Sequence, residues 1–238
     1  MENLKIQILD YFKGLQFDEK EHKYAVDGQQ IKISVSGVIK NFVEPFDKYT
    51  ISARIAARDG ISQEDVLKSW ETEAQRACTN GKDTHLFGEL YPFNRHIKPR
   101  TKFEEAIVNF WNDLPSTVIP VVMELQMYHK EYMFAGTADI LLYNTVTNTF
   151  IIGDYKTNKD LFKNYKGKTL LSPFKNLLDS PYNKYQLQLS FYQLSLEQTG
   201  FKVSSRKLIW LKPDGTYLLY NTDDYTDILK EQLKIIKI

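Results

Sequence analysis

Three runs of strand-forming residues follow one another closely near the middle of the sequence. They constrain the fold more than any other part of the chain. The runs cover residues 118–129, 131–143 and 149–156, and each is rich in aliphatic, β-branched or aromatic side chains. Ala135-Gly136 interrupts the second run. The turn-forming segment 144–148 (NTVTN) separates the second run from the third, so we expect these two to pair as antiparallel strands.

The segments after these strands complete a layered pattern. We expect a long loop over residues 157–182 and a helix over 183–199. Two strands, 202–211 and 216–220, should be joined by the turn Lys212-Pro-Asp-Gly215, and an amphipathic helix should cover 223–238. Loops as long as the one over 157–182 are usually functional or mobile. From Gly81 onward the order is helix, three strands, helix, two strands, helix, which predicts an α/β domain with a central sheet flanked by helices.

The first 114 residues are mostly helical in pattern. Residues 15–17 and 22–26 predict two short strands, which an Asp27-Gly28 turn follows, and residues 31–33 then alternate apolar and polar side chains. A short helix follows from Ser34 to about Val43. The further expected helices cover 1–13, 47–58, 62–79, 82–91 and 101–113, with Gly60 and Gly81 as breaks. We treat 1–238 as one domain with three parts: an N-terminal hairpin and short helix (1–45), a helical region (46–114), and the sheet with its C-terminal helix (115–238).

Composition excludes several classes of protein. With 31 basic and 30 acidic residues the net charge is +1, so charge alone does not indicate a polyanion binder. Cys78 is the single cysteine, which excludes disulfide frameworks, cysteine zinc sites and iron–sulfur clusters held by four cysteines; we expect it to be buried. No apolar run approaches the roughly 18 residues of a membrane span, and no signal or transit peptide is evident. We expect a cytoplasmic protein without a membrane partner.

Acidic and basic side chains gather at one end of the predicted sheet. Asp154 and Lys156 are two apart in a strand and therefore share a face, and the short turn can place Asp139 beside Asp154. Two adjacent carboxylates repel unless a cation holds them, and oxygen ligands suit Mg²⁺ or Mn²⁺. Lys156 can then orient or deprotonate a water and stabilise charge on a phosphate. The alternative is a surface Asp–Lys strand with an incidental cross-strand charge.

The wider context adds an ordered set of motifs. They are His85 in Gly81-Lys-Asp-Thr-His85, Glu124 on the first strand, Asp139 after Gly136-Thr-Ala, the segment Asp154-Tyr-Lys156-Thr157, and Gln188-Leu-Ser-Phe-Tyr192. This set resembles the PD-(D/E)XK nuclease superfamily in its RecB-like exonuclease branch. Upstream, His22-Lys-Tyr24, Asp27-Gly28 and Ser34-Val-Ser36 are similar to the N-terminal hairpin of mitochondrial genome maintenance exonucleases and their phage relatives. The resemblance covers roughly residues 15–211; Ala138 stands where the pattern has proline.

The resemblance implies a fold and a set of roles. The core would be α-β-β-β-α-β, with a mixed central sheet. Asp139, Asp154, His85 and the backbone carbonyl of Tyr155 would bind a divalent metal, and Glu124 would hold a second ion or its waters. Lys156 would position the attacking water. Gln188 and Tyr192 would orient Lys156 or a phosphate, and Thr157 would donate to a phosphate. No iron–sulfur cluster is implied.

Each of these roles has a plainer alternative. His85 can pair with Glu89 on an exposed helix, and Glu124 can be a solvent-facing strand residue between Met123 and Leu125. Tyr192 can be core packing and Gln188 surface. We expect His129, which follows a strand, to lie at the surface.

The helical region 46–114 is the expected path of the substrate. In the resembled exonucleases such helices form an arch through which a single strand threads. The expected DNA contacts are Ser36, Arg54, Arg58, Lys82, Arg100 and Lys102, with Trp70, Phe87, Tyr91 and Phe93 available to stack on bases. The alternative is ordinary solvated helix faces, with the aromatic side chains in a local core.

The function that follows from the resemblance is a Mg²⁺- or Mn²⁺-dependent DNA exonuclease, bacterial or phage-encoded, acting on single-stranded or end-exposed DNA. Its partners would be DNA and other replication or recombination proteins. Three alternatives stay open: an endonuclease of the same superfamily, a catalytically inactive DNA-binding module, and a structural protein in which the charged strand is incidental.

Overall fold

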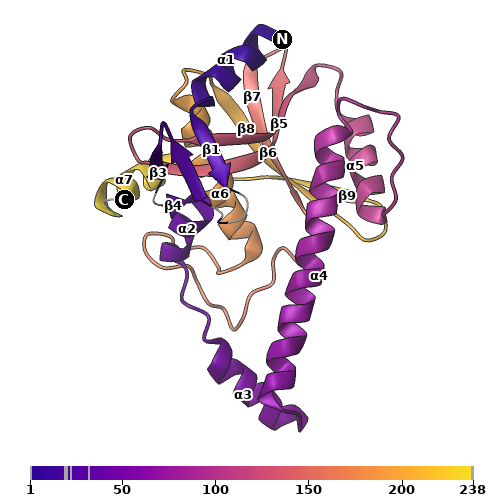
Figure 1. The fold of residues 1–238 in the computed structure, drawn as a ribbon, viewed down its shortest axis with the longest axis vertical. Coiled ribbons are helices and arrows are strands. Elements are labelled where there is room, and N and C mark those ends of the chain that lie inside the picture. Colours follow the sequence, from indigo (N-terminus) through magenta and orange to yellow (C-terminus); the bar gives the residue numbers. More distant parts are fainter. Residues whose placement is uncertain (1, 19–20, 22, 32, 237–238) are drawn as a thin grey trace.

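A mixed central sheet organises the protein. The computed structural model describes residues 2–18, 21, 23–31 and 33–236. Within this described part the central sheet has six strands in the order β4-β6-β7-β8-β9, with β5 on the other side of β6. The strands are β4 (Ile33–Ser34), β5 (Val118–Tyr128), β6 (Phe134–Asn144), β7 (Thr149–Lys156), β8 (Val203–Leu211) and β9 (Tyr217–Asn221). Figure 1 shows this sheet behind the N-terminal elements.

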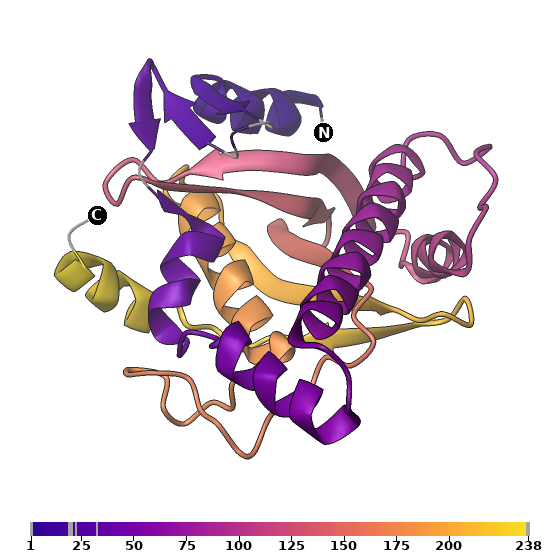
Figure 2. The same cartoon turned by 60° about the horizontal axis from the view of Figure 1, so that its bottom comes forward.

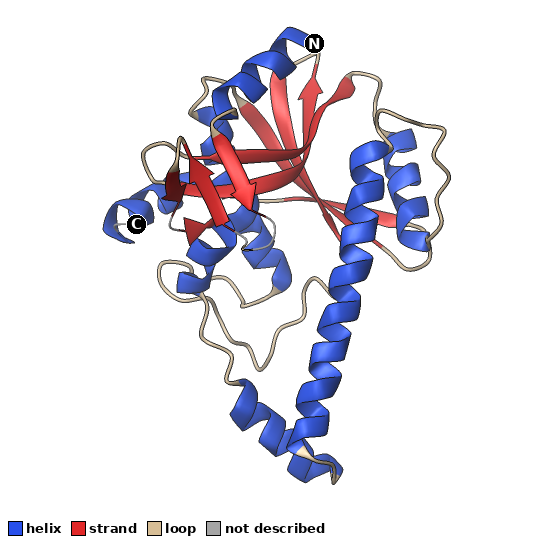
Figure 3. Cartoon of the chain, in the orientation of Figure 1, coloured by secondary structure: helices blue, strands red, loops and turns tan. Residues whose placement is uncertain are grey.

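The connections explain the strand directions. β5–β6, β6–β7 and β8–β9 are antiparallel neighbours joined by short turns, as expected for the second and third strand-like runs. β7 and β8 run parallel because the chain crosses over between them through α6 (Pro181–Glu197). The expected mixed α/β architecture, with helices flanking a central sheet, is confirmed (Figure 3).

Both faces of the sheet are buried. On β6, Leu141 packs in a first apolar cluster with α6 and α7 (Thr226–Ile236), whereas its neighbours Ile140 and Leu142 pack in a second cluster with α4 (Gln63–Leu90) and α5 (Lys102–Asp113). This is the alternation of a strand covered on both sides. The prediction that Ala135-Gly136 breaks the second strand is wrong, because both residues pair within β6. A glycine is required at 136, where a Cβ would lie 2.8 Å from the Tyr192 ring.

The N-terminal part contains one more strand than expected. After α1 (Glu2–Phe12), the strands β1 (Leu15–Asp18), β2 (Lys23–Val26) and β3 (Gln29–Ile31) form a three-stranded antiparallel sheet among the described residues, with the predicted turn between β2 and β3. The Ser34 side chain caps α2 (Val35–Ile39), as expected, but the helix ends early in the 3₁₀ turn η1 (Lys40–Phe42). His22 and Lys32 lie outside the described residues.

Helices α3 (Lys48–Asp59) and α4 form an arm that projects from the sheet (Figure 1), and Figure 2 shows the molecule turned so that the tip of this arm comes forward. α3 ends at Gly60 and α4 begins after Ser62, as predicted, whereas Asp47, the predicted first residue of α3, is its N-cap. The predicted break at Gly81 is wrong, since α4 is a single helix of 28 residues that continues through this glycine. One glycine costs a helix only about 1 kcal/mol, which neighbouring turns can offset. Residues 71–80 are exposed on every side, so the expectation that Cys78 is buried is also wrong. Among the described helices, none is long and apolar enough to span a bilayer.

The helix predicted from residue 101 is α5, and it begins with a capping box. The Thr101 hydroxyl accepts a hydrogen bond from the backbone N–H of Glu104, whose carboxylate accepts one from the backbone N–H of Thr101. α6 begins two residues before its expected start, because Ser180 is its N-cap and Pro181 occupies the first turn.

Gly81 and Gly88 lie two turns apart in α4, the first in open space and the second against a buried ring. Substitutions at these two positions therefore test how closely α4 packs on the sheet. A Cβ at Gly88 would lie 2.6 Å from the ring of Tyr155, a buried side chain whose hydroxyl accepts a 2.7 Å hydrogen bond from Trp111. A Cβ at Gly81 would meet nothing within 4 Å. We expect Gly88→Ala to lower the free energy of unfolding by about 1–3 kcal/mol and Gly81→Ala to raise it by about 0.5–1 kcal/mol. Urea denaturation measures both, and effects of equal sign would contradict the packing described.

The expectation that His129 lies at the surface is wrong, and this has a consequence for acid stability. The imidazole is 9% exposed and stacks on Tyr132 and Phe134. Burial, with a smaller contribution from Lys230, lowers the pKa of His129 to about 4. The unfolded chain therefore binds a proton between pH 6.5 and about 4 that the folded protein does not, so stability falls as the pH falls through this range.

We expect the melting temperature of His129→Gln to decline less over the same pH range than that of the native protein, since glutamine does not titrate. Thermal unfolding followed by circular dichroism measures the two profiles. The variant of the exposed His96, His96→Gln, is the control and should follow the native profile. Parallel profiles for all three proteins would rule out His129 as a source of acid sensitivity.

Candidate metal centre

The sheet opens where its carboxylates lie. The ladder between β6 and β7 ends at the pair Ile140 and Gly153, so the next residues, Asp139 and Asp154, are neighbours on adjacent strands, as the short turn predicts. Beyond this point the Asp139 side chain replaces the backbone ladder, because its Oδ2 accepts a 2.8 Å hydrogen bond from the Tyr155 N–H. β4 pairs with β6 only at Phe134 and Ala135. On that side residues 136–139 therefore have no strand partner in the described part of the chain.

Glu124 reaches the same point through an unusual backbone conformation. Its φ is +51°, in the left-handed region that costs a non-glycine residue about 1 kcal/mol or more. The expected alternation is lost there: Met123 packs in the second cluster and Leu125 in the first, although the two residues are two apart. Glu124 lies between them, across from Asp139 in the register of β5 and β6. Strained residues of this kind are enriched at functional sites.

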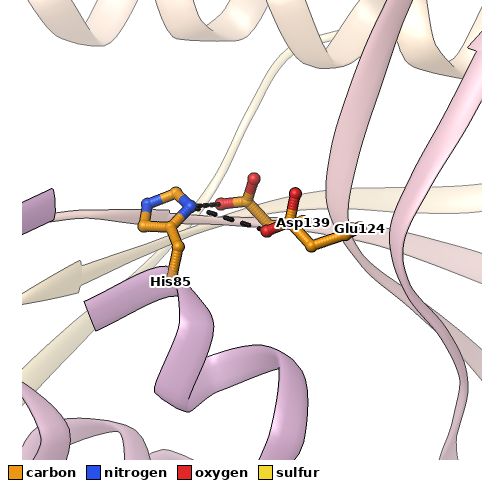
Figure 4. Close-up of side chains that lie close together, drawn as sticks. All are labelled: His85, Glu124 and Asp139. Atoms are coloured by element: carbon orange, nitrogen blue, oxygen red, sulfur yellow. Dashed lines mark ion pairs between the residues drawn. The ribbon is translucent and has the colours of Figure 1, made fainter. Parts of the chain in front are cut away.

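His85 on α4 completes a group of three. Its Nδ1 lies 3.3 Å from Oδ2 of Asp139 and 3.7 Å from Oε1 of Glu124, and Figure 4 shows the imidazole facing both carboxylates. One ligand atom from each of the three residues lies within 4.8 Å of the others, so the group could hold a metal ion. The plainer interpretation of His85, a pair with Glu89, is not what the structure shows, and Glu124 does not simply face solvent.

The charges of this group depend on one another. Burial by itself lowers the pKa of His85, but the charge of Asp139 and hydrogen bonds to Asp139 and Glu124 outweigh it and raise the pKa to about 10. Burial raises the pKa of Glu124. Burial also opposes ionisation of Asp139, but His85 more than compensates and lowers its pKa. The imidazolium thus supplies the positive charge that two converging carboxylates require.

Asp154 and Lys156 form a second, deeper pair. The Lys156 ammonium contacts Oδ2 of Asp154, whose side chain is almost completely buried. Burial and the neighbouring Asp139 raise the pKa of Asp154 to about 6, while the two carboxylates overcome the effect of burial and raise the pKa of Lys156. Apart from the Lys156 contact, neither carboxylate oxygen of Asp154 has a hydrogen-bond partner among the described residues. Buried carboxylate oxygens without partners, beside an imidazole and a second carboxylate, fit a divalent cation such as Mn²⁺ or Mg²⁺.

Tyr185 is a contact of the lysine that sequence reasoning missed. The Lys156 Nζ lies 4.3 Å from the centroid of the Tyr185 ring, at the start of α6. The Tyr185 hydroxyl donates a 3.0 Å hydrogen bond to the Asn158 side chain, and Trp210 Nε1 donates one to the Asn158 carbonyl. Together they hold the end of β7. Tyr185 precedes Gln188 by three residues, so the shared helix face was the available signal.

The two predicted residues further along α6 contact each other and not Lys156. Gln188 Nε2 donates a 2.7 Å hydrogen bond to the Tyr192 hydroxyl, and Tyr192 is buried in the first cluster. The pKa of Tyr192 is well above its usual value because of burial and, secondarily, the charge of Asp154. Among the described residues, the contacts of the Lys156 ammonium are Asp154 and Tyr185, and not this pair.

The residues predicted to contact DNA lie in four places. Thr157 follows Lys156 directly and is half-buried, and Ser36 is exposed at the start of α2, hydrogen-bonded to Ser34. The predicted contacts Arg54, Arg58 and Lys82 are exposed on the arm. Arg100 and Lys102 lie at the start of α5, on the outer side of α4 in Figure 1. Arg58 and Lys102 form ion pairs with Asp59 and Glu105.

The predicted stacking residues divide by burial. Phe87 and Tyr91 are 6% and 5% exposed and stack on each other in the second cluster, so the structure contradicts their availability to bases. Trp70 is half-buried near Phe46 on the arm. Phe93 is 57% exposed.

Comparison with known proteins adds no assignment: no protein-family model matches the chain, and no curated protein sequence matches it.

Binding of Mn²⁺ to the group of His85, Glu124 and Asp139 should raise the melting temperature of the protein, because the ion binds the folded protein and not the unfolded chain. We expect Asp139→Asn to abolish this increase at metal concentrations that saturate the native protein, because it removes a ligand charge from the buried group. The exposed Glu73 on the arm supplies the control, Glu73→Gln, which should keep the full increase. Differential scanning fluorimetry over a Mn²⁺ titration measures the effect. An unchanged increase in Asp139→Asn would place the bound ion elsewhere.

Proposed function

We propose that this protein is a divalent-metal-dependent DNA exonuclease acting on single-stranded or end-exposed DNA, with the PD-(D/E)XK nuclease core that its motifs resemble. The observation that carries the proposal is the convergence of Asp139, Asp154, His85, Glu124 and Lys156. They come from three strands and one helix, and no short segment brings them together. Such a group of acids with one buried lysine is suited to phosphodiester hydrolysis.

The five residues would have two roles: four would be metal ligands, and Lys156 would be a charged hydrogen-bond donor. Asp139, Glu124 and His85 would hold one ion, which would take over the positive charge of the imidazolium as His85 gives up its proton to become a ligand. Asp154 with the Tyr155 carbonyl would complete or extend the ligand set. A bound ion would polarise the phosphate and lower the pKa of a water. Lys156 is held protonated by its two carboxylate neighbours, so it serves as a hydrogen-bond donor that positions the nucleophile and stabilises negative charge. Its expected alternative role, deprotonating the water, fits this charge state less well.

The arm supports the preference for a single strand. It carries Arg54, Arg58 and Lys82 on exposed faces, and α4 leads directly from its tip to His85. A flexible single strand lying along the arm could place its phosphates against these cations and its end at the metal centre.

The test is digestion of end-labelled single-stranded DNA with Mn²⁺, with EDTA as the metal-free control. We expect Lys156→Gln to lower kcat by about a thousandfold, since removing one hydrogen-bond donor that stabilises the transition state typically lowers kcat by about this factor. The control is Lys163→Gln, an exposed lysine of the loop after β7, which should retain activity. Thermal unfolding verifies that both variants fold.

The substrate set separates the alternatives. Circular single-stranded DNA should stay intact, and its linearisation would indicate an endonuclease. Binding that persists in EDTA, without cleavage once metal is restored, would indicate an inactive DNA-binding module. Failure of the native protein to degrade any DNA or RNA with either metal would refute the proposal.

A further inference from the structure

A groove leads away from the metal centre along β5. It consists of two adjoining hollows of about 290 and 280 Å³ that share Val122 and Met123 as a common wall. The first hollow lies between α1 and the end of α4, and the second continues along α1 to β1. β5 pairs only with β6 in the described part of the chain, so its outer edge faces this groove.

We propose that the groove binds the unpaired nucleobase of the nucleotide next to the scissile phosphate, with Phe93 as the stacking platform. This inference rests on the proposed nuclease function and adds a base-binding subsite to it.

The groove and the metal centre share one side chain. Glu124, a member of the His85–Glu124–Asp139 group, also lines the second hollow. Glu89 lines the first hollow and lies one helical turn from His85 on α4. The groove therefore adjoins the metal centre at Glu124, beside the place where a phosphate would be held.

The lining of the groove suits an aromatic ring. Leu90, Val122 and Met123 supply apolar surface, and Phe93 forms an outer wall. Phe93 is 57% exposed, and no other aromatic ring of the described residues stacks on it. This distinguishes it from Phe87 and Tyr91, whose faces cover each other. An exposed phenyl ring in an apolar hollow can stack on any base, because every base has a π-face.

The charges favour a base inside the groove and phosphates at its rims. Lys5 lines the first hollow with its Nζ over one face of the Phe93 ring, 5.5 Å from the centroid, so a base would stack on the other face or displace this ammonium. Lys13 lines the second hollow and pairs with Asp10 in the free protein. These cations can meet the phosphates on either side of a bound nucleotide. The carboxylates of Glu89 and Glu124 on the inner wall disfavour an anion there but not a neutral base. In a duplex both faces of a base are covered, so the subsite selects an unpaired end.

The experiment compares strands with and without a base at the attacked end. Single-stranded oligodeoxythymidine carries either a normal or an abasic nucleotide at its 5′ or 3′ end, and steady-state cleavage is measured with Mn²⁺. For the native protein, we expect the abasic residue at the attacked end to raise KM about tenfold with little change in kcat, from the loss of one stacking contact. Phe93→Ala should show the same increase on the normal strand and no further increase on the abasic strand.

Two further variants separate stacking from general damage. Phe93→Tyr keeps the ring and should behave as the native protein. Leu219→Ala removes an exposed apolar side chain on β9, at the other edge of the sheet, and should leave KM unchanged.

The possible failures are distinguishable. An unchanged KM for Phe93→Ala, or a full abasic effect in that variant, overturns the subsite while the nuclease function stands. Concentration-dependent dimers that Phe93→Ala dissociates, without any abasic effect, would make the groove an interface between copies and also overturn it. No cleavage of any strand by the native protein overturns both proposals.

Discussion

The burial of two carboxylates side by side is the constraint on which the rest of this structure depends. Asp139 and Asp154 lie at the point where β7 leaves β6, and both are removed from water. Ionised carboxylates cannot share such a site without positive charge. His85 supplies that charge from α4 and Lys156 from β7 itself, and each has its pKa raised by the carboxylates it faces. The position of α4 against the sheet and the close approach of Gly88 to Tyr155 therefore serve the same end, which is to bring an imidazole to this point.

Two surfaces of different chemistry adjoin the candidate metal centre. The arm offers exposed cations on a helix that is anchored only at its ends. The groove beside β5 offers an apolar wall and one exposed aromatic ring. A single nucleic-acid strand has both kinds of surface, phosphates and bases, so the proposed base-binding groove extends the proposed nuclease site and meets it at Glu124.

Much of the sheet and part of the site were predictable because they depend on local patterns. The turn between β6 and β7 is short, and the period of a strand is two, so the juxtaposition of Asp139, Asp154 and Lys156 followed from counting. The backbone of Glu124 did not follow, because its left-handed conformation reverses the alternation on which counting relies. The continuity of α4 through Gly81, the burial of His129 and the contact of Tyr185 with Lys156 were also missed. Each depends on which distant residues pack nearby.

The sequence by itself determined most element types, their order from α5 onward, the placement of Asp139 beside Asp154 and the residue types available for metal chemistry, since these arise from side-chain periodicity, caps and turns over a few residues. Tertiary structure alone decided which of those residues meet. His85 is far from Asp139 along the chain, and its choice of Asp139 and Glu124 over the nearby Glu89 depends on how α4 packs on the sheet. That packing also buries the aromatic pair Phe87 and Tyr91 and leaves Phe93 exposed, because burial depends on all the elements around a residue and not on the residue's own neighbours in sequence.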